Sequence, residues 1–295
     1  MRIVLTGSSG RIGRAIYNAL ITQHQVIGID RSAFSTTQII SDFVNIDLLI
    51  KVMQGADAVI HTAALHAPHV GIVPDSEFQR INVEGTRLVI EAAKITGMPR
   101  LVFTSTTAIF GQTIKDGRAA WVGDESVPQP RSIYHYTKLA AEALLKDAAN
   151  ESLIIRSIHM SRCFPEQADI IALYRLTRGV DVRDVARAHV AALTNGGDSY
   201  QSYIISGTTP FLPEDGSLLA TNLEAAIQKR IPSLLIAFKE RGWKLPASLD
   251  RVYVSKTEAG LGWAPRYGFE EVLAQLNRGS LEVLPVHVSQ NQHEE

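Results

Sequence analysis

Short apolar runs alternate with longer amphipathic segments through the first half of this 295-residue chain. The runs carry hydrophobic residues at consecutive positions, a pattern typical of strands buried on both faces of a parallel sheet. It predicts strands at 2–5, 25–30, 43–47, 57–64, 101–111 and 152–157. Helical periodicity between the strands predicts helices at 11–23, 48–53, 77–97 and 134–149. The alternation favours an α/β fold, a doubly wound parallel sheet with helices on both faces.

The C-terminal part of the chain continues with a sparser pattern. It predicts helices at 184–194, 218–231 and 269–278, strands at 200–206 and 251–255, and a polar, disordered tail ending in SQNQHEE. There is no internal repeat and no linker rich in Pro, Gly or Ser. We therefore expect a main domain over 1–160, to which 182–206 returns, and a small subdomain formed mainly by 161–295.

The first predicted strand leads into the segment Thr6-Gly-Ser-Ser-Gly-Arg-Ile-Gly13, with glycines at 7, 10 and 13. A strand, a glycine-rich turn and a helix together present backbone N–H groups and the positive helix end to a pyrophosphate. The spacing here is GxxGxxG, whereas the standard dinucleotide fingerprint is GxGxxG. By itself the segment is equally consistent with a nucleotide site and with a structural turn.

The second predicted strand ends in Asp30, which lies 17 residues beyond Gly13. A carboxylate near this position of a nucleotide-binding unit accepts hydrogen bonds from the adenosine ribose and repels a 2′-phosphate, which favours NAD. Arg31 follows directly and could pair with the 2′-phosphate of NADP instead. The alternative is that Asp30 only caps the next turn.

Composition excludes several classes of protein. The chain is 45% hydrophobic and 20% charged with a net charge of −1, which indicates no nucleic-acid or membrane surface. The single cysteine, Cys163, forms no intramolecular disulfide and suits a reducing compartment. The first strand begins at the N-terminus without a signal peptide, and no apolar run approaches the roughly 20 residues that span a bilayer. We expect a cytoplasmic protein with no nucleic-acid or membrane partner.

Two further segments carry polar chemistry. The loop at 65–76 contains His66 and His69, but no third ligand with metal spacing follows, so we predict no metal site. His66 faces either a substrate pocket or solvent, and His61, within an apolar strand, is expected to be a core residue. Tyr134 and Lys138 are four positions apart and therefore share one face of their predicted helix.

In this order the motifs resemble the extended short-chain dehydrogenase/reductase family, of the NAD-dependent epimerase/dehydratase type. Nearly the whole chain takes part in the resemblance. The matching segments are TGSSGRIG at 6–13, Asp30, Asp47, HTAA at 61–64, INVEGT at 81–86, LVFTSTTAIFG at 101–111, YHYTK at 134–138, IIRS at 154–157, VDVRDVARAH at 180–189 and LGWAPRYGFEE at 261–271. The resemblance implies a Rossmann NAD(P)-binding domain, a small C-terminal substrate-binding subdomain, and a homodimer formed through 77–97 and 134–149.

The resemblance also implies functional residues. The catalytic set is Thr106, Tyr134 and Lys138: Tyr134 removes the hydroxyl proton, Thr106 binds the same oxygen, and Lys138 with the nicotinamide lowers the pKa of the phenol towards neutrality. In that family Lys138 also binds the nicotinamide ribose, and Asn82 supports the core near the cofactor. The implied cofactor-binding residues are Gly7, Ser9, Gly10, Arg11, Ile12, Gly13, Asp30, Arg31, Asp47, Leu48, Thr62, Ala63, Ala64, Asn82, Thr104, Tyr134 and Lys138.

Departures from the family pattern narrow the chemistry. Thr107 and Ala108 stand where dehydratases carry acidic residues, and Cys163 looks like a small buried residue and not the cysteine of an epimerase–reductase. His159 stands where UDP-sugar epimerases usually have an asparagine, and the segment that follows it is short. The dehydratase reaction is therefore disfavoured, and the substrate is expected to be small.

The segment Ser161-Arg-Cys-Phe-Pro-Glu166 is similar to one in uronate dehydrogenases. Arg162 or Arg175 could pair with a substrate carboxylate or phosphate, or could lie on the surface. The expected substrate-binding residues are His66, Thr106, His159 and Arg162. The sequence thus predicts NAD(P)-dependent hydride transfer at a secondary alcohol of a sugar, sugar acid or nucleotide sugar. The alternatives are a UDP-sugar 4-epimerase proper and a non-catalytic NAD(P)-binding regulatory protein.

Overall fold

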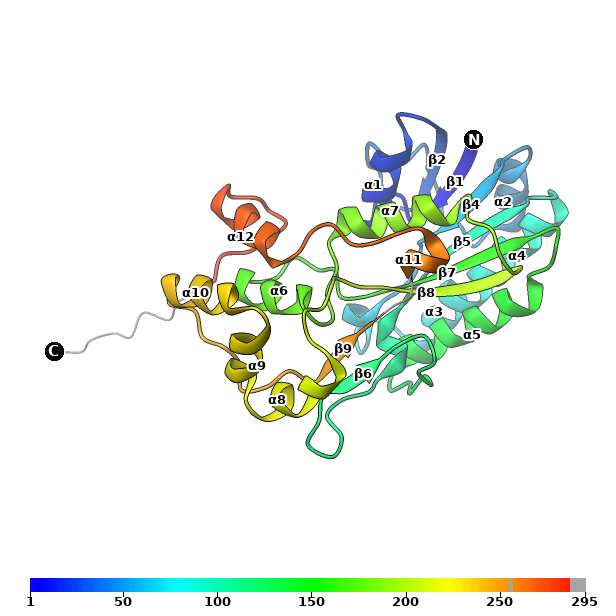
Figure 1. Cartoon of the computed structure of the whole chain (residues 1–295). Helices are drawn as coiled ribbons and strands as arrows, with labels where there is room; N and C mark the ends of the chain where they lie inside the picture. The colour runs from blue at the N-terminus through cyan, green and yellow to red at the C-terminus, as the bar shows by residue number, and fades with distance from the viewer. Residues whose placement is uncertain (255–256, 287–295) are drawn as a thin grey trace.

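A seven-stranded parallel sheet forms the centre of the molecule, with the strand order β3-β2-β1-β4-β5-β7-β8 (Figure 1). The computed structural model describes residues 1–254 and 257–286. The strands are β1 (Arg2–Thr6), β2 (Gln25–Asp30), β3 (Ile39–Ile40), β4 (Ala58–His61), β5 (Arg100–Thr106), β7 (Ile154–Met160) and β8 (Tyr200–Ile205). The order reverses at β1 and β4, so the carboxyl ends of these two strands flank the crevice where doubly wound folds bind ligands.

Helices cover both faces of this sheet, because successive strand residues are apolar and point to opposite sides. On one face Val4 packs with α2 (Ile46–Met53), α4 (Gly85–Ile95) and α5 (Ile133–Ala148). On the other face Ile3 and Leu5 pack with α1 (Arg11–Leu20) and α7 (Val182–Ala192), and α11 (Thr257–Leu261) joins this layer. The predicted doubly wound α/β fold is confirmed.

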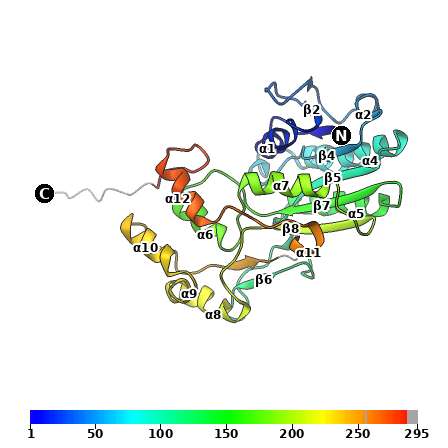
Figure 2. The same cartoon turned by 45° about the horizontal axis from the view of Figure 1, so that its top comes forward.

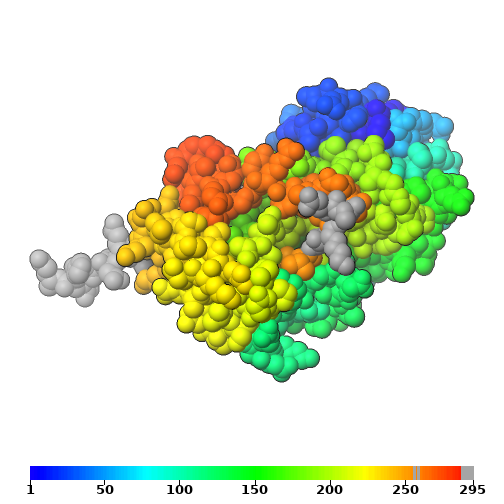
Figure 3. Space-filling model, viewed as in Figure 1, coloured from blue at the N-terminus to red at the C-terminus, as the bar shows by residue number. Residues whose placement is uncertain are grey.

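The C-terminal part of the chain builds a second lobe beside the sheet, mostly coloured yellow to red in Figures 2 and 3, with α6 in green in Figure 2. Its own apolar core includes Leu219, Phe238 and Val272. The lobe contains α6 (Ala168–Arg175), 3₁₀ helix η4 (Pro213–Asp215), α8 (Gly216–Thr221), α9 (Leu223–Arg230), α10 (Pro232–Glu240) and α12 (Phe269–Asn277). A two-stranded parallel sheet of β6 (Ala120–Val122) and β9 (Arg251–Tyr253) lies between the lobes. Within the described residues, every helix is too short or too polar to cross a membrane.

The predicted strand at 43–47 is wrong. Asn45 instead caps α2, because its side-chain oxygen accepts a hydrogen bond from the N–H of Leu48 at 3.0 Å. The third strand is the two-residue β3, which pairs with the end of β2. The segment predicted as a strand therefore contains the N-cap and the first residues of α2. The predicted polar tail ending in SQNQHEE lies outside the described residues.

The predicted helix at 77–97 is helical but not regular. It consists of α3 (Asp75–Phe78), the π-helix η2 (Gln79–Glu84) and α4. The strand predicted at 101–111 ends at Thr106 and continues as the 3₁₀ helix η3 (Thr107–Phe110), and the loop at 65–76 includes the 3₁₀ turn η1 (Ala67–His69). The predicted helix at 218–231 is broken at Asn222, which caps α9. The pattern gave no sign of β6, α6 or α10.

Candidate active site

Three glycines shape the turn between β1 and α1. Gly7 has a left-handed backbone, with φ at +75°, and a Cβ there would lie 2.6 Å from Thr62 Oγ1. A Cβ on Gly13 would lie 2.0 Å from the carbonyl oxygen of Gly7. A Cβ on Gly10 would meet only that same oxygen, at 3.3 Å. Gly7 and Gly13 are therefore required by packing within the protein, whereas the side of Gly10 is open to an approaching ligand.

The N-terminus of α1 has the donors that an anion needs. Gly10 is its N-cap and no side chain caps the helix, so the N–H groups of the first turn, Arg11 to Gly13, face an uncapped end. The Arg11 side chain turns away, donating from Nε to the carbonyl oxygen of Cys163 at 2.9 Å and forming an ion pair with Glu282. The turn has the shape and the donors to hold a dinucleotide pyrophosphate.

Asp30 lies at the carboxyl end of β2, beside the glycine-rich turn. Its two carboxylate oxygens accept hydrogen bonds from the N–H groups of Ser9 and Ser32, each at 3.0 Å. The capping arrangement considered from sequence thus exists, and it also fixes the carboxylate next to the turn. Arg31 and Asp47 are exposed at the same edge, where Leu48 is half-buried.

The end of β4 is held from two sides. Thr62 Oγ1 donates to the carbonyl oxygen of Thr6 at 2.7 Å, and the half-buried Ala63 and Ala64 follow. Asn82, in the π-helix, accepts from the N–H of Leu65 at 2.8 Å and donates to its carbonyl oxygen at 2.9 Å. The wide π turn explains the irregular helix, since it presents Asn82 to this loop.

Thr106, Tyr134 and Lys138 come together at the carboxyl end of β5. Thr106 is the last residue of the strand, and its Oγ1 accepts from the N–H of Ala108 at 3.1 Å and is hydrogen-bonded to the Tyr134 hydroxyl. Lys138 Nζ donates to the carbonyl oxygen of Thr104 at 2.6 Å and lies 3.9 Å from the ring centroid of Phe103. Both α5 side chains are buried.

Burial controls the acid–base properties of this group. It raises the pKa of Tyr134 to about 12, although the hydrogen bond from Thr106 lowers it. The expected shift of this pKa towards neutrality includes the charge of the nicotinamide, and it stays a prediction. Burial also lowers the pKa of Lys138 to about 7, and the Glu142 carboxylate partly opposes that shift. A buried phenol resists losing its proton and a buried amine resists gaining one, so Tyr134 is neutral at pH 7 while Lys138 changes between ammonium and amine near that pH.

Comparison with known proteins places this geometry in a family. The sequence profile of the "NAD dependent epimerase/dehydratase family" matches residues 3–164, more than half of the chain. The chain belongs to this family. An L-arabinose 1-dehydrogenase (NAD(P)(+)) of Haloferax volcanii is 34% identical over 153 residues, which are 48% of this chain and 59% of that protein. The chain spans about half the length of the curated relatives it matches.

Solved structures of similar fold cover nearly the whole epimerase/dehydratase chain. A UDP-glucuronic acid 4-epimerase from Bacillus cereus, solved with UDP-glucuronic acid and NAD, has a TM-score of 0.68 at 21% identity, covering 94% of this chain and 98% of its own. A mutated uronate dehydrogenase has a TM-score of 0.65 at 17% identity, covering 99% and 89%. These similarities establish the shared fold.

The two arginines considered from the sequence as substrate ligands are each paired with a carboxylate. Arg162 donates two hydrogen bonds to Glu166, at 2.6 and 2.7 Å, and its side chain is 45% exposed. Arg175 is buried in an ion pair with Asp181 at 2.9 Å, so it is not a surface arginine. Both arginines border a narrow crevice of about 10 Å³.

The histidines of the chain have different surroundings. His66 is half-buried, 5.8 Å from the ring of Phe164, and its N–H donates to His69 Nδ1 at 3.0 Å. In the described part of the chain no three His, Cys, Asp or Glu side chains are grouped as metal ligands would be. His61 is hydrogen-bonded to Thr6 and Thr86 inside the core, as predicted.

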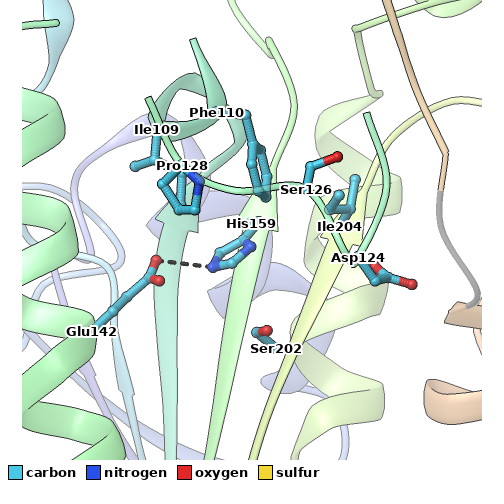
Figure 4. A pocket seen from close by; sticks show the side chains of 9 residues that line it. All are labelled: Ile109, Phe110, Asp124, Ser126, Pro128, Glu142, His159, Ser202 and Ile204. Atoms are coloured by element: carbon cyan, nitrogen blue, oxygen red, sulfur yellow. Dashed lines mark ion pairs between the residues drawn. The ribbon is translucent and has the colours of Figure 1, made fainter. Parts of the chain in front are cut away.

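His159 lies beside a residue that the sequence reasoning missed. Its Nε2 is 2.9 Å from an oxygen of Glu142, and both line a cavity of about 200 Å³ (Figure 4). The other lining residues are Ile109, Phe110, Asp124, Ser126, Pro128, Ser202 and Ile204. Glu142 is four residues beyond Lys138 on a predicted helix, so helical spacing could have placed it on the buried face.

Proposed function

We propose that this chain is an NAD(P)-dependent oxidoreductase that transfers hydride at a hydroxyl-bearing carbon of a sugar or sugar acid. Thr106, Tyr134 and Lys138 are its catalytic residues. The observation that carries the proposal is the hydrogen-bonded contact of Tyr134 with Thr106, beside the buried Lys138 and at the same edge of the sheet as the glycine-rich turn.

The proposed cofactor is NAD. The uncapped N-terminus of α1 would hold its pyrophosphate, Asp30 its adenosine ribose, and the segment Thr62–Ala64 would border its nicotinamide half. When bound, the oxidised nicotinamide would supply the hydride acceptor and a positive charge at the site. Asp30 supports NAD over NADP, and the exposed Arg31 is the residue through which NADP would be accepted instead.

The chain's own residues would handle the proton. Thr106 Oγ1 would hold the substrate hydroxyl oxygen, and Tyr134 would take the proton from that oxygen. With a pKa of about 12, Tyr134 needs nearby positive charge to act as a base at neutral pH. Lys138 supplies such a charge when it is protonated, which is why the state of this amine matters.

The crevice beside Arg162 measures only about 10 Å³ while Arg162 and Glu166 occupy it, so it would have to open for a small substrate and would have to open further for a nucleotide sugar. Arg162 would release Glu166 to bind a substrate carboxylate, and His66 would border the substrate from the loop at 65–76. The arabinose dehydrogenase and the uronate dehydrogenase support this class by sequence and by fold. The fold shared with a UDP-glucuronic acid 4-epimerase makes epimerisation the second candidate.

A substrate panel tests the proposal. Purified protein is incubated with NAD or NADP and aldoses, uronic acids or UDP-sugars, with absorbance at 340 nm for reduced cofactor and chromatography for epimers. We expect reduction of NAD with a free sugar or sugar acid. Epimers without net reduction would replace the dehydrogenase by the 4-epimerase, and cofactor binding without any turnover would indicate a regulatory protein. A homodimer through α4 and α5, and a cytoplasmic location, stay predictions.

A further inference from the structure

Glu142 is a buried carboxylate that the proposed chemistry does not yet use. It lies one helical turn after Lys138 on α5, and its side chain is only 12% exposed. Ser105 Oγ donates a hydrogen bond to its Oε1, and His159 Nε2 lies 2.9 Å from the same oxygen. Ser105 belongs to β5 and His159 to β7, so two strands fix this carboxylate beneath α5.

The carboxylate stays ionised in spite of burial. Burial opposes ionisation, but His159, Ser105 and Lys138 together hold the pKa of Glu142 below its usual value. A buried charge is tolerated only when hydrogen bonds and an opposite charge compensate for the lost water. The polar partners around Glu142 therefore serve to keep a negative charge at this place.

That negative charge acts on titratable groups of three elements. On α5 it raises the pKa of Lys138 against the effect of burial, and it adds to the raised pKa of Tyr134. On β8 it adds to the raised pKa of Tyr200, whose larger cause is burial. On β7 it faces His159, and Asp124 lines the same cavity. Lys138 is the one cation among these groups whose charge the proposed reaction needs.

We propose that Glu142, held in place by Ser105 and His159, is a positioning residue that keeps the Lys138 ammonium charged during the reaction. This inference rests on the proposed function, because the charge of Lys138 matters only if Tyr134 acts as the base. Without Glu142, the buried amine would lose its proton at a lower pH, and Tyr134 would lose that favourable charge over more of the neutral range.

The first experiment measures the amine itself, independently of turnover. The ¹⁵Nζ signal of Lys138 is assigned by its loss in Lys138→Met and titrated by NMR in the wild type and in Glu142→Gln. We expect a titration near pH 7 in the wild type and a fall of about one pH unit in Glu142→Gln. Asp147→Asn, which removes an exposed carboxylate of the same helix, leaves the titration unchanged. An unchanged Lys138 titration in folded Glu142→Gln would overturn the proposal.

The second experiment links this charge to the reaction. In Glu142→Gln the alkaline limb of the kcat/KM profile moves down by about one pH unit, with an activity loss of about tenfold above it. Asp147→Asn keeps the wild-type profile. If the Lys138 titration shifts while the kcat/KM profile stays unchanged, Glu142 favours the ammonium form but the reaction does not depend on that charge. The proposed role in the reaction would then be refuted. If no sugar reacts in any variant, the proposed function fails, and the NMR titration still reports on the amine.

A chemical rescue separates charge from packing. The cavity of about 200 Å³ reaches both Glu142 and His159, so a small carboxylate can enter the space that a truncated side chain leaves. We expect formate to restore at least half of the activity lost in Glu142→Ala and to leave the wild type and Lys138→Met unaffected. A folded Glu142→Ala that keeps full activity without formate would show that this carboxylate is dispensable.

Discussion

The glycine-rich turn before α1 and the crevice beside Arg162 border the same candidate site but are built differently. In the turn, Gly7 and Gly13 are required because a Cβ would collide with neighbouring atoms, and the ligand-facing donors belong to the backbone. In the crevice the polar groups belong to side chains, and Arg11 and Arg162 each form an ion pair with a carboxylate. In the proposed function a cofactor would meet a preformed surface, whereas a charged substrate would have to exchange partners with groups already paired.

The largest expected effect lies between the two regions, at Tyr134. Tyr134→Phe removes the proposed base and its hydrogen bond with Thr106 while keeping the ring in the core. We expect a loss of kcat of about 10³-fold with NAD affinity unchanged within twofold, measured by steady-state kinetics and calorimetry. Tyr136→Phe, an exposed position of the same helix, serves as the control. Full activity of Tyr134→Phe would refute the proposed mechanism.

Two glycine variants test whether the turn is preformed. Gly13→Ala places a Cβ 2.0 Å from the Gly7 carbonyl oxygen and is expected to destabilise the fold by about 3 kcal/mol in urea denaturation. In Gly10→Ala the added Cβ lies 3.3 Å from that oxygen. We therefore expect the free energy of unfolding to fall by less than about 1 kcal/mol, together with weaker NAD binding. Equal destabilisation by the two variants would mean that the turn rearranges to accept a Cβ, and the turn would then not be a preformed surface.

Asp30 tests which cofactor the turn selects. Asp30→Asn keeps an acceptor oxygen for Ser9 but removes the charge that repels a 2′-phosphate. We expect the ratio of NAD to NADP affinity, measured by calorimetry, to fall about tenfold. Asp57→Asn makes the same charge change just before β4, at the amino ends of the strands, and should leave the affinity ratio unchanged. Preference for NADP in the wild type would assign the selectivity to Arg31.

The smallest expected effect concerns the crevice. Arg162→Ala removes a 45% exposed side chain, so the free energy of unfolding should change by less than about 0.5 kcal/mol. The KM for sugar acids should rise about fivefold while that for neutral sugars stays constant. Arg278→Ala, which removes a comparably exposed arginine paired with Glu271, is the control for both measurements. A KM unchanged for acids would remove Arg162 from the substrate site.

Most of the fold could be predicted because its pattern is local and strong. Buried strands such as β1 and β4 need consecutive apolar residues, and that pattern is visible in a dozen positions. The predicted boundaries of the helices and strands were wrong where a single asparagine side chain sets the local backbone structure. Asn45 and Asn222 cap helices that apolar spacing alone did not delimit, and Asn82 lies in a π-helix that a regular periodicity does not describe.

The candidate site was predicted in part. Tyr134 and Lys138 share a helical face by spacing alone, and the structure places them beside Thr106 and Thr104. The raised pKa of Tyr134 was not foreseen, because burial depends on everything packed above the helix. The partner of Arg11 was not foreseen either, since Glu282 is far from Arg11 in the sequence.

The sequence by itself determined the backbone of this protein: the alternating elements, the glycine-rich turn and the helical spacing of the tyrosine and the lysine. These features depend on neighbours within a few residues, where steric limits and hydrophobic spacing act directly. Only the tertiary structure decided which distant charges meet, as at Glu142 with His159 and at Arg11 with Glu282. Charge, burial and pKa result from groups that folding brings together, and so the proposed acid–base chemistry follows from packing.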